Sequence, residues 1–399
     1  MKKVLFVINT LGRAGAETAL MELLRRMDPR EYEISLYVLL GQGEMIDAVP
    51  SHVKVLNRSY DPTPVLSKDG KRRMRRSVCK AMFKHGNVFR LFPYLVKNLF
   101  AMVCRHKIMT EKLLWRILSD GAERFDTHYD MAVAYLEGGS SYYVSDWVKA
   151  DCKVAFVHVD YNRAGYTRAL DKNCYRNFNQ IFTVSDEVRT AFLQAYPECK
   201  DKTDVFHNIL NQEEILRKSQ DGEGFTDDFD GFRLLSVGRL TTQKAFEVSV
   251  DAMKLLKDAG YPVRWYVLGD GNQRRMLEDK INKLGLQKDF LLPGAVANPY
   301  PFMRMADIYV HASRFEGKSI AIQEAQIIGM PIVASDCSGN REQIISGEDG
   351  LLCEFTSQAI YEAVKLLLED EAMRVRFGKK ASLRNANAVA EMDKLLSLI

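Results

Sequence analysis

Short apolar runs recur along the chain, each followed by a polar loop and then by a stretch with helical spacing. The first run, residues 4–8, is almost continuously apolar, which is typical of a strand buried on both faces of a parallel sheet. A glycine-containing loop follows it, then leucines at helical spacing, and then a second apolar run over 34–40. Strand, loop, helix and strand in this order predict the start of a doubly wound α/β domain.

The same alternation continues through the chain and restarts once. Further strands are predicted at 131–135, 153–158, 180–184, 205–207, 232–237, 264–268, 290–292, 308–311, 332–335 and 351–353, and the later helices at 245–259, 273–284, 319–328 and 358–369. Residues 221–231 are rich in glycine and acids without an apolar period, which is typical of a linker. The sequence therefore predicts two tandem doubly wound domains, 1–220 and 232–375, followed by a helix over 376–399 that returns to the first domain.

Composition and charge narrow the class of protein. The 399 residues are 47% hydrophobic and 27% charged, which is ordinary for a folded protein, and the net charge of +4 is too small to indicate a nucleic-acid binder. Seven widely spread cysteines without a CxxC pair indicate reduced thiols and argue against a zinc site. The apolar run at the N-terminus ends at Asn9, too early for a signal peptide, and no run reaches about 18 apolar residues, so a cytoplasmic protein is expected.

One segment, residues 68–116, departs from this balance. It holds fourteen Lys or Arg residues against two acids, interleaved with aromatic and aliphatic side chains. A basic amphipathic segment is typical of a membrane-surface element, because each cation near an anionic surface contributes about 1 kcal/mol. The alternative is a solvated helical excursion whose apolar side covers the domain. We expect peripheral contact with an anionic membrane.

Two glutamates eight residues apart, Glu316 and Glu324, mark the most informative stretch. Glu316 follows a predicted strand, and Glu324 lies within the helix that comes next. Gly317 allows a ligand to approach the backbone closely, and the amides of Lys318 and Ser319 fall at the helix N-terminus, which favours anions. Carboxylates accept hydrogen bonds from sugar hydroxyls while amides bind phosphate, so the stretch suits a sugar nucleotide. A surface glutamate plus a paired helix glutamate is the alternative.

A second stretch, residues 237–244, follows the first strand of the second domain and opens a helix. Arg239 and Lys244 can both turn toward a diphosphate at the carboxyl end of that strand, with forked contacts from the guanidinium and a point charge from the ammonium. Two solvated basic residues are the alternative.

Together these stretches resemble glycosyltransferase family 4, retaining enzymes of the GT-B fold. Four segments match in the family's order, and they extend from residue 4 to about 355: the loop 12–17, Gly238-Arg239 with Lys244, Asn298-Pro299-Tyr300-Pro301 before Ala306-Asp307, and Glu316 with Glu324. The residues in these segments are similar to those of the branch of the family that builds bacterial surface or capsular polysaccharides.

The resemblance implies a role for each matching residue. Arg239 and Lys244 would hold the donor diphosphate, Glu316 the hydroxyls of the transferred sugar, and Glu324 the ribose hydroxyls. The remaining implied donor-binding positions are Gly15, Ala295, Val296, Gly317, Lys318 and Ser319. His158, after the strand at 153–157, matches the family's active-site histidine; without the resemblance it would be interpreted as a structural histidine.

The activity implied is retaining transfer of a hexose or N-acetylhexosamine from a nucleotide sugar, with UDP as the default, to a hydroxyl acceptor. A lipid-linked glycan at the inner face of the membrane is the expected acceptor. Two cations and helix amides on the diphosphate make a metal cofactor dispensable. No residue is identified as a glycosyl-accepting nucleophile, so a same-face displacement is preferred.

Some residues depart from the family or support other interpretations. Residues 207–211 lack the Gly and Asp that many relatives have beside the matching Asn208, and Ala245 stands where glycine is usual. The sequence Asp228-Phe229-Asp230 lies in the acidic linker, away from any buried strand, and is not expected to bind a metal. Two alternatives stay open: a sugar-nucleotide epimerase on the same fold, and a binding protein without turnover.

Overall fold

The computed structural model describes residues 1–65, 67–84, 92, 94, 96, 110–162, 164–384 and 388–399. Part of the basic segment, including Phe89, Leu91, Leu95, Leu99 and Phe100, therefore lies outside the described residues. The chain forms two compact units, Met1–Ile209 with Asn387–Ile399, and Leu210–Ala386.

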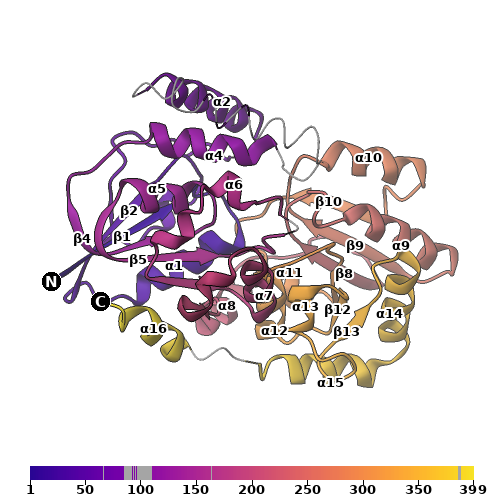
Figure 1. Cartoon of the computed structure of the whole chain (residues 1–399). Coiled ribbons are helices and arrows are strands. Elements are labelled where there is room, and N and C mark those ends of the chain that lie inside the picture. Colours follow the sequence, from indigo (N-terminus) through magenta and orange to yellow (C-terminus); the bar gives the residue numbers. More distant parts are fainter. Residues whose placement is uncertain are drawn as a thin grey trace. The chain divides into compact units, whose positions relative to one another are not determined.

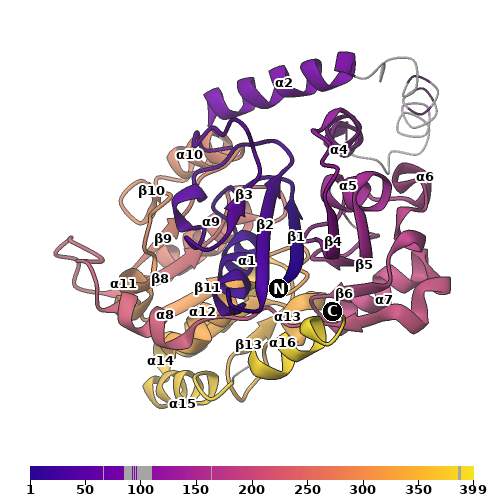
Figure 2. The same cartoon turned by 90° about the vertical axis from the view of Figure 1, so that its left-hand side faces the viewer.

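The first unit is built on a seven-stranded parallel sheet in the order β3-β2-β1-β4-β5-β6-β7 (Figure 2). Its strands are β1 (Lys2–Ile8), β2 (Tyr32–Val38), β3 (Lys54–Val55), β4 (His128–Ala134), β5 (Lys149–Val157), β6 (Gln180–Thr183) and β7 (Thr203–Val205). Its helices are α1 (Gly15–Arg26), α2 (Lys68–Phe83), α4 (Thr110–Gly121), α5 (Gly139–Trp147), α6 (Arg168–Asp171), α7 (Asp186–Ala195) and α16 (Ala388–Leu396).

Both faces of this sheet are buried, because successive side chains of β1 enter different cores. Val4 and Phe6 pack with leucines of α1, whereas Leu5 and Val7 pack with residues of α4 and α5. This explains why the strand is apolar at every position instead of alternating. Beyond this layer, α2 packs across α4 (Figure 1).

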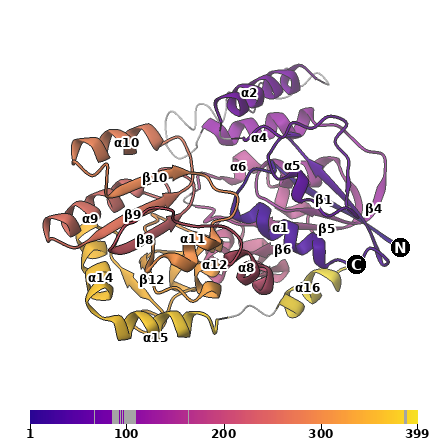
Figure 3. The same cartoon turned by 180° about the vertical axis from the view of Figure 1, so that it is seen from behind.

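The second unit has a six-stranded parallel sheet in the order β10-β9-β8-β11-β12-β13 (Figure 3). Its strands are β8 (Phe232–Val237), β9 (Val263–Leu268), β10 (Phe290–Gly294), β11 (Ile308–His311), β12 (Ile332–Ser335) and β13 (Leu351–Cys353). Its helices are α8 (Gln212–Ser219), α9 (Phe246–Asp258), α10 (Arg274–Lys283), α11 (Tyr300–Met305), α12 (Ile320–Ile328), α13 (Ser338–Arg341), α14 (Ser357–Glu369) and α15 (Glu371–Ala381). The expected fold class, two doubly wound α/β units, is confirmed.

The boundary between the units differs from the expected linker. The division falls after Ile209, and residues 221–231 belong to the second unit. Phe225 is buried against Tyr266, and Asp227 accepts hydrogen bonds from Arg233 and Arg264. The segment resembles a linker in composition, but its few apolar and acidic side chains find partners on the amino-terminal side of β8 and β9.

The C-terminal segment also divides differently from the expected 376–399. Helix α15 remains in the second unit, and only Asn387–Ile399 belongs to the first. Met392 and Leu395 of α16 join the core beside α1, and Glu391 accepts a hydrogen bond from the backbone of His207 at 3.1 Å. These contacts fasten the end of the chain to the first unit.

Candidate functional site

In the second unit, most of the predicted donor-binding residues lie in the loops that follow β8, β10 and β11. Arg239 and Lys244 come after β8, Ala295 and Val296 after β10, and Glu316 after β11. Because all these strands are parallel, their carboxyl ends meet at one edge of the sheet, the edge where such folds bind ligands.

Lys244 and Glu316 form the central ion pair of this edge. The Lys244 ammonium donates to Oε1 of Glu316 at 2.6 Å, and the two side chains are 16% and 8% exposed. Burial raises the pKa of Glu316, but Lys244 and then His311 outweigh it, so the net shift is downward. Glu316 is therefore an ionised, buried carboxylate, a strong acceptor for hydroxyl donors.

His311, the last residue of β11, lies beside this pair and was missed by the sequence analysis. Its Nε2 is 3.1 Å from Oε1 of Glu316 and 3.4 Å from Nζ of Lys244. Burial and then Lys244 lower the pKa of His311, so the ring is neutral at neutral pH. Its position at the carboxyl end of a predicted buried strand was the available signal.

Glu324 lies on α12 and has a different partner. The Tyr300 hydroxyl donates to its Oε1 at 2.8 Å. Burial raises the pKa of Glu324 to about 7, although the Tyr300 hydrogen bond opposes the shift. Tyr300 belongs to the quoted Asn298-Pro299-Tyr300-Pro301 motif, but the sequence did not indicate that its hydroxyl would hold this carboxylate.

The start of α12 differs from expectation at one amide. The backbone N–H of Ser319 donates to Oε1 of Gln343 at 2.7 Å, so this amide already has a partner. The Ser319 side chain does not cap the helix, which leaves the positive end of α12 open to an anion. Gly317 and Lys318 precede this end, Gly317 buried and Lys318 half-buried.

Close backbone contacts fix the loops of this edge. A Cβ added at Gly269, where φ is +154°, would lie 1.9 Å from the carbonyl oxygen of Gly238, and one added at Gly339 would lie 2.3 Å from that of Gly317. The loops after β8 and β11 are therefore held by contacts that admit no side chain. Ala245 adopts φ 49°, in the left-handed region that favours glycine, the residue expected there from the family resemblance.

The other predicted donor residues are more open. Arg239 is exposed and makes no ion pair within the described part of the chain. Ala295 is exposed, and Val296 is half-buried against the core that contains Tyr266 and Ile322. Arg239 is thus free to turn toward a ligand, in contrast to Lys244.

In the first unit, His158 follows β5 and is held through its backbone. Its N–H donates to Oε2 of Glu137 at 2.9 Å, while its ring Nε2 is buried without a partner in the described structure. Burial lowers the pKa of this imidazole. Asn9, after β1, donates to the carbonyl of Glu137 at 3.1 Å. Gly15 is the first residue of α1. The sequence analysis missed Glu137, which lies just past β4.

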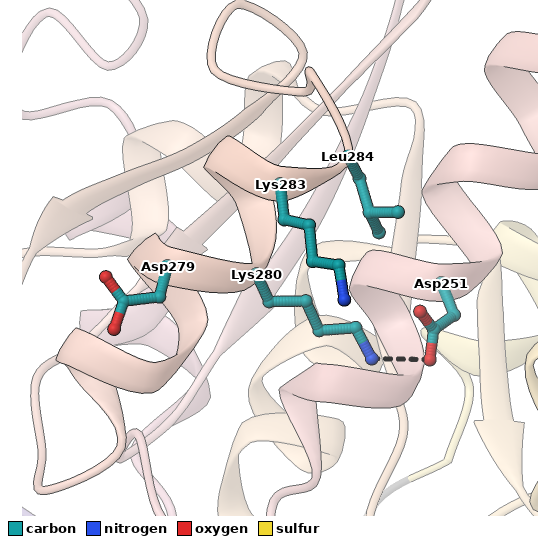
Figure 4. Close-up of a pocket in the computed structure, with 5 residues that line it drawn as sticks. All are labelled: Asp251, Asp279, Lys280, Lys283 and Leu284. Atoms are coloured by element: carbon teal, nitrogen blue, oxygen red, sulfur yellow. Dashed lines mark hydrogen bonds and ion pairs between the residues drawn. The ribbon is translucent and has the colours of Figure 1, made fainter.

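A hollow of about 410 Å³ lies elsewhere in the second unit, between α9 and α10 (Figure 4). Its lining residues are Asp251, Asp279, Lys280, Lys283 and Leu284, none of which belongs to the predicted site. Lys280 points to Asp251 and pairs with it at 2.6 Å. No group of three His, Cys, Asp or Glu side chains suited to a metal occurs among the residues that the structure describes.

The match to a known family falls within this second unit. Residues 226–384 match the family model described as glycosyl transferases group 1. A Campylobacter jejuni protein, N-acetylgalactosamine-N,N'-diacetylbacillosaminyl-diphospho-undecaprenol 4-alpha-N-acetylgalactosaminyltransferase, is 31% identical over 46% of this chain and 49% of its own length. An amylovoran biosynthesis glycosyltransferase of Erwinia amylovora is 28% identical over 40% of this chain and 45% of its own length. The chain thus spans about half the length of the curated relatives it matches.

Among solved structures, Anabaena HepE in complex with UDP-glucose matches at a TM-score of 0.68 with 17% identity, covering both chains completely. At this identity the likeness shows the fold, which is the two-domain GT-B arrangement anticipated from the sequence.

Proposed function

We propose, from the match of residues 226–384 to the glycosyl transferases group 1 family, that this chain transfers a hexose or N-acetylhexosamine from a nucleotide sugar to a hydroxyl acceptor. The observation that carries the proposal is the buried Lys244–Glu316 pair at 2.6 Å, next to the uncapped start of α12. A cation and a helix N-terminus suit a diphosphate, and an ionised carboxylate suits sugar hydroxyls.

Each donor residue then has a role. Arg239 and Lys244 neutralise the diphosphate, and Glu316 accepts from hydroxyls of the sugar. Glu324 accepts from the ribose hydroxyls, and the backbone at Ala295 and Val296 meets the base. UDP is the proposed nucleotide, supported by the UDP-glucose in the Anabaena HepE structure.

The proposed reaction retains the anomeric configuration. Charge develops on the leaving diphosphate, so Arg239, Lys244 and the α12 terminus supply the main electrostatic stabilisation. The acceptor attacks from the same face, and the departing phosphate takes its proton. This scheme needs no metal, so we expect full activity in excess chelator; activity that returns only with Mn²⁺ or Mg²⁺ would exclude it. A trapped adduct on Glu316 would instead indicate double displacement.

For the acceptor we propose a lipid-linked glycan of surface or capsular polysaccharide synthesis. The C. jejuni relative is named for a diphospho-undecaprenol substrate, and the E. amylovora relative for amylovoran biosynthesis. His158 is proposed to act beside the transferred sugar, and Gly15 to let the loop before α1 approach the donor. The ring Nε2 of His158 is buried without a partner within the described residues, so a hydroxyl that reached it would complete its hydrogen bonding.

Helix α2 supports a peripheral association with an anionic membrane. Lys68, Arg72, Arg73, Arg75, Arg76 and Lys80 are all exposed on it, and only Gly70 and Ala81 are buried. No helix in the described part of the chain is both long and apolar enough to cross a membrane. We therefore propose that contact with the inner face of the membrane is electrostatic and reversible.

The test of the function is a thermal-shift screen of the full chain against UDP, GDP, ADP, CMP and their common sugars, followed by product analysis. A ligand at 100 times its Kd adds about 2.7 kcal/mol of stability. A shift with one nucleotide that is lost in Lys244→Ala or Glu324→Ala supports the site. Release of an epimerised sugar without acceptor would instead identify an epimerase, and binding without any turnover a binding protein.

A further inference from the structure

The Glu316 carboxylate has two unequal oxygens. Oε1 accepts from Nζ of Lys244 at 2.6 Å and lies 3.1 Å from Nε2 of His311. Within the described part of the chain, Oε2 has no hydrogen-bond partner, and it is not sealed from solvent in the way that the buried unpartnered atoms are. One oxygen is therefore anchored twice, and the other is left for a ligand.

The two anchors differ in how firmly they are held. Lys244 reaches Glu316 on a flexible four-carbon stem and carries three N–H groups, so it can follow the carboxylate or a diphosphate. His311 is the last residue of β11, its side chain is only 3% exposed, and its ring lies 3.2 Å from the Ser313 hydroxyl. The histidine is thus the fixed partner of the pair.

The proton that His311 contributes follows from the carboxylate that its ring faces. Its Nδ1 is 3.4 Å from the Tyr309 hydroxyl, which donates to the carbonyl of Val237 at 3.4 Å. With its single proton on Nε2, the neutral ring donates to Oε1 of Glu316 at 3.1 Å. A ring that accepted from Lys244 instead would leave Glu316 with one donor, a poorer arrangement for a buried carboxylate.

We propose that His311 is a positioning residue that fixes the Glu316 carboxylate through Nε2–H, so that Oε2 faces the sugar of the donor. This inference rests on the proposed function and adds a residue to it. Without the ring, the Glu316 carboxylate would rotate together with the Lys244 ammonium, and Oε2 would no longer be directed at the sugar. Arg239 and Lys244 would both still be able to bind the diphosphate. His311 should therefore govern recognition of the sugar and not of the nucleotide.

The test compares two substitutions of the full chain. His311→Gln keeps an N–H donor at the distance of Nε2, whereas His311→Leu keeps comparable bulk without a donor. Binding of UDP, UDP-glucose, UDP-N-acetylglucosamine and UDP-N-acetylgalactosamine is measured for each by calorimetry. We expect His311→Leu to bind UDP within about twofold of the parent affinity. For the preferred sugar, the ratio of UDP-sugar affinity to UDP affinity should fall at least tenfold in this variant. In His311→Gln, both the UDP affinity and this ratio should stay within about threefold of the parent protein.

Equal losses for UDP and the UDP-sugar in His311→Leu would show a merely structural histidine and overturn the inference. If the leucine variant does not fold, His311→Asn replaces it, since its shorter amide donor cannot reach Oε1; full sugar recognition in that variant would also overturn the inference. Failure of the parent protein to bind any nucleotide sugar would overturn the proposed function itself, which is a separate and recognisable result.

Discussion

The side-chain amide of Gln343 forms two hydrogen bonds with the backbone of Ser319. Its oxygen accepts from the Ser319 N–H at 2.7 Å, and its nitrogen donates to the Ser319 carbonyl at 2.8 Å. Both residues are buried, so the pair fixes the first residue before α12. We expect Gln343→Ala to lower the free energy of unfolding by about 2 kcal/mol, because two hydrogen bonds are lost and a buried amide is left unsatisfied.

Urea denaturation measures this loss. Gln358→Ala is the control, because the hydrogen bond that Gln358 donates to Glu362 is exposed to solvent. It should change stability by less than about 0.5 kcal/mol. A Gln343→Ala protein as stable as this control would mean that the start of α12 does not depend on the amide pair.

Stability should depend on pH through Glu324. Its pKa is raised from 4.5 to about 7 in the folded chain, so between those pH values the folded protein binds more protons than the unfolded one. Stability therefore falls as the pH rises through this window, by about 3 kcal/mol in total. Glu324→Gln carries no titrating group and should escape this decline.

Chemical denaturation at pH 4 and pH 8 tests this. The variant should gain about 3 kcal/mol relative to the parent protein between the two pH values, while losing nucleotide affinity. The exposed Glu362→Gln is the control and should follow the parent at both. An identical pH dependence in Glu324→Gln and the parent would contradict the assignment.

Substitution of Arg239 and of Lys244 should have similar effects on catalysis but different effects on stability. Arg239→Ala and Lys244→Ala should each cost roughly 2–4 kcal/mol in kcat/KM, the scale of losing one electrostatic donor to the transition state. Only Lys244→Ala should also destabilise the fold, because it removes the cation from the buried Glu316 carboxylate. Arg239 is exposed and makes no ion pair within the described residues, so its removal should leave the melting temperature unchanged.

Steady-state kinetics and thermal melts of both variants give these numbers. The exposed Arg275→Ala on α10 serves as the matched loss of one positive charge. Less than about tenfold loss of activity in Arg239→Ala would count against its role on the diphosphate.

Membrane binding should depend on α2. Replacing the exposed Arg72, Arg75 and Arg76 by Ala should weaken sedimentation with phosphatidylglycerol-containing vesicles by about 3 kcal/mol, or roughly a hundredfold, and raising the salt should do the same to the parent protein. The control variant replaces Arg275, Lys283 and Lys288 by Ala, which removes the same charge from exposed positions of the second unit. Equal loss in both triples would show a net-charge effect, and no loss in either would exclude α2 as the membrane surface.

The sheets were predictable where a strand is a short, mainly apolar run. The bounds of β8, β11, β12 and β13 match the predicted runs, because most positions of these strands are apolar and polar loops follow them. Strand β3 was missed since Lys54 and Val55 are two partly exposed residues without a pattern. Residues 221–231 were misassigned as a linker because composition does not reveal that Asp227 would meet Arg233 and Arg264.

The candidate site was predictable only where a residue's type and its place after a strand pointed the same way. Lys244 and Glu316 are 72 residues apart in sequence, and the structure brings them together. His311, Gln343 and Tyr300 act through partners that only the fold supplies, so their contacts could not be predicted from the local sequence. The amide of Ser319 was correctly predicted to lie at the start of a helix. It donates its hydrogen bond to the side chain of Gln343, which the sequence did not indicate.

The contact between Gly339 and the carbonyl of Gly317 leaves no room for even a methyl group. The main chain that carries Glu316 therefore follows a path that a longer or shorter loop could not keep. Variation in this loop is confined to exchange of side chains on an unchanged backbone. An engineer who wishes to alter what this unit accepts should exchange side chains there and leave the loop length alone.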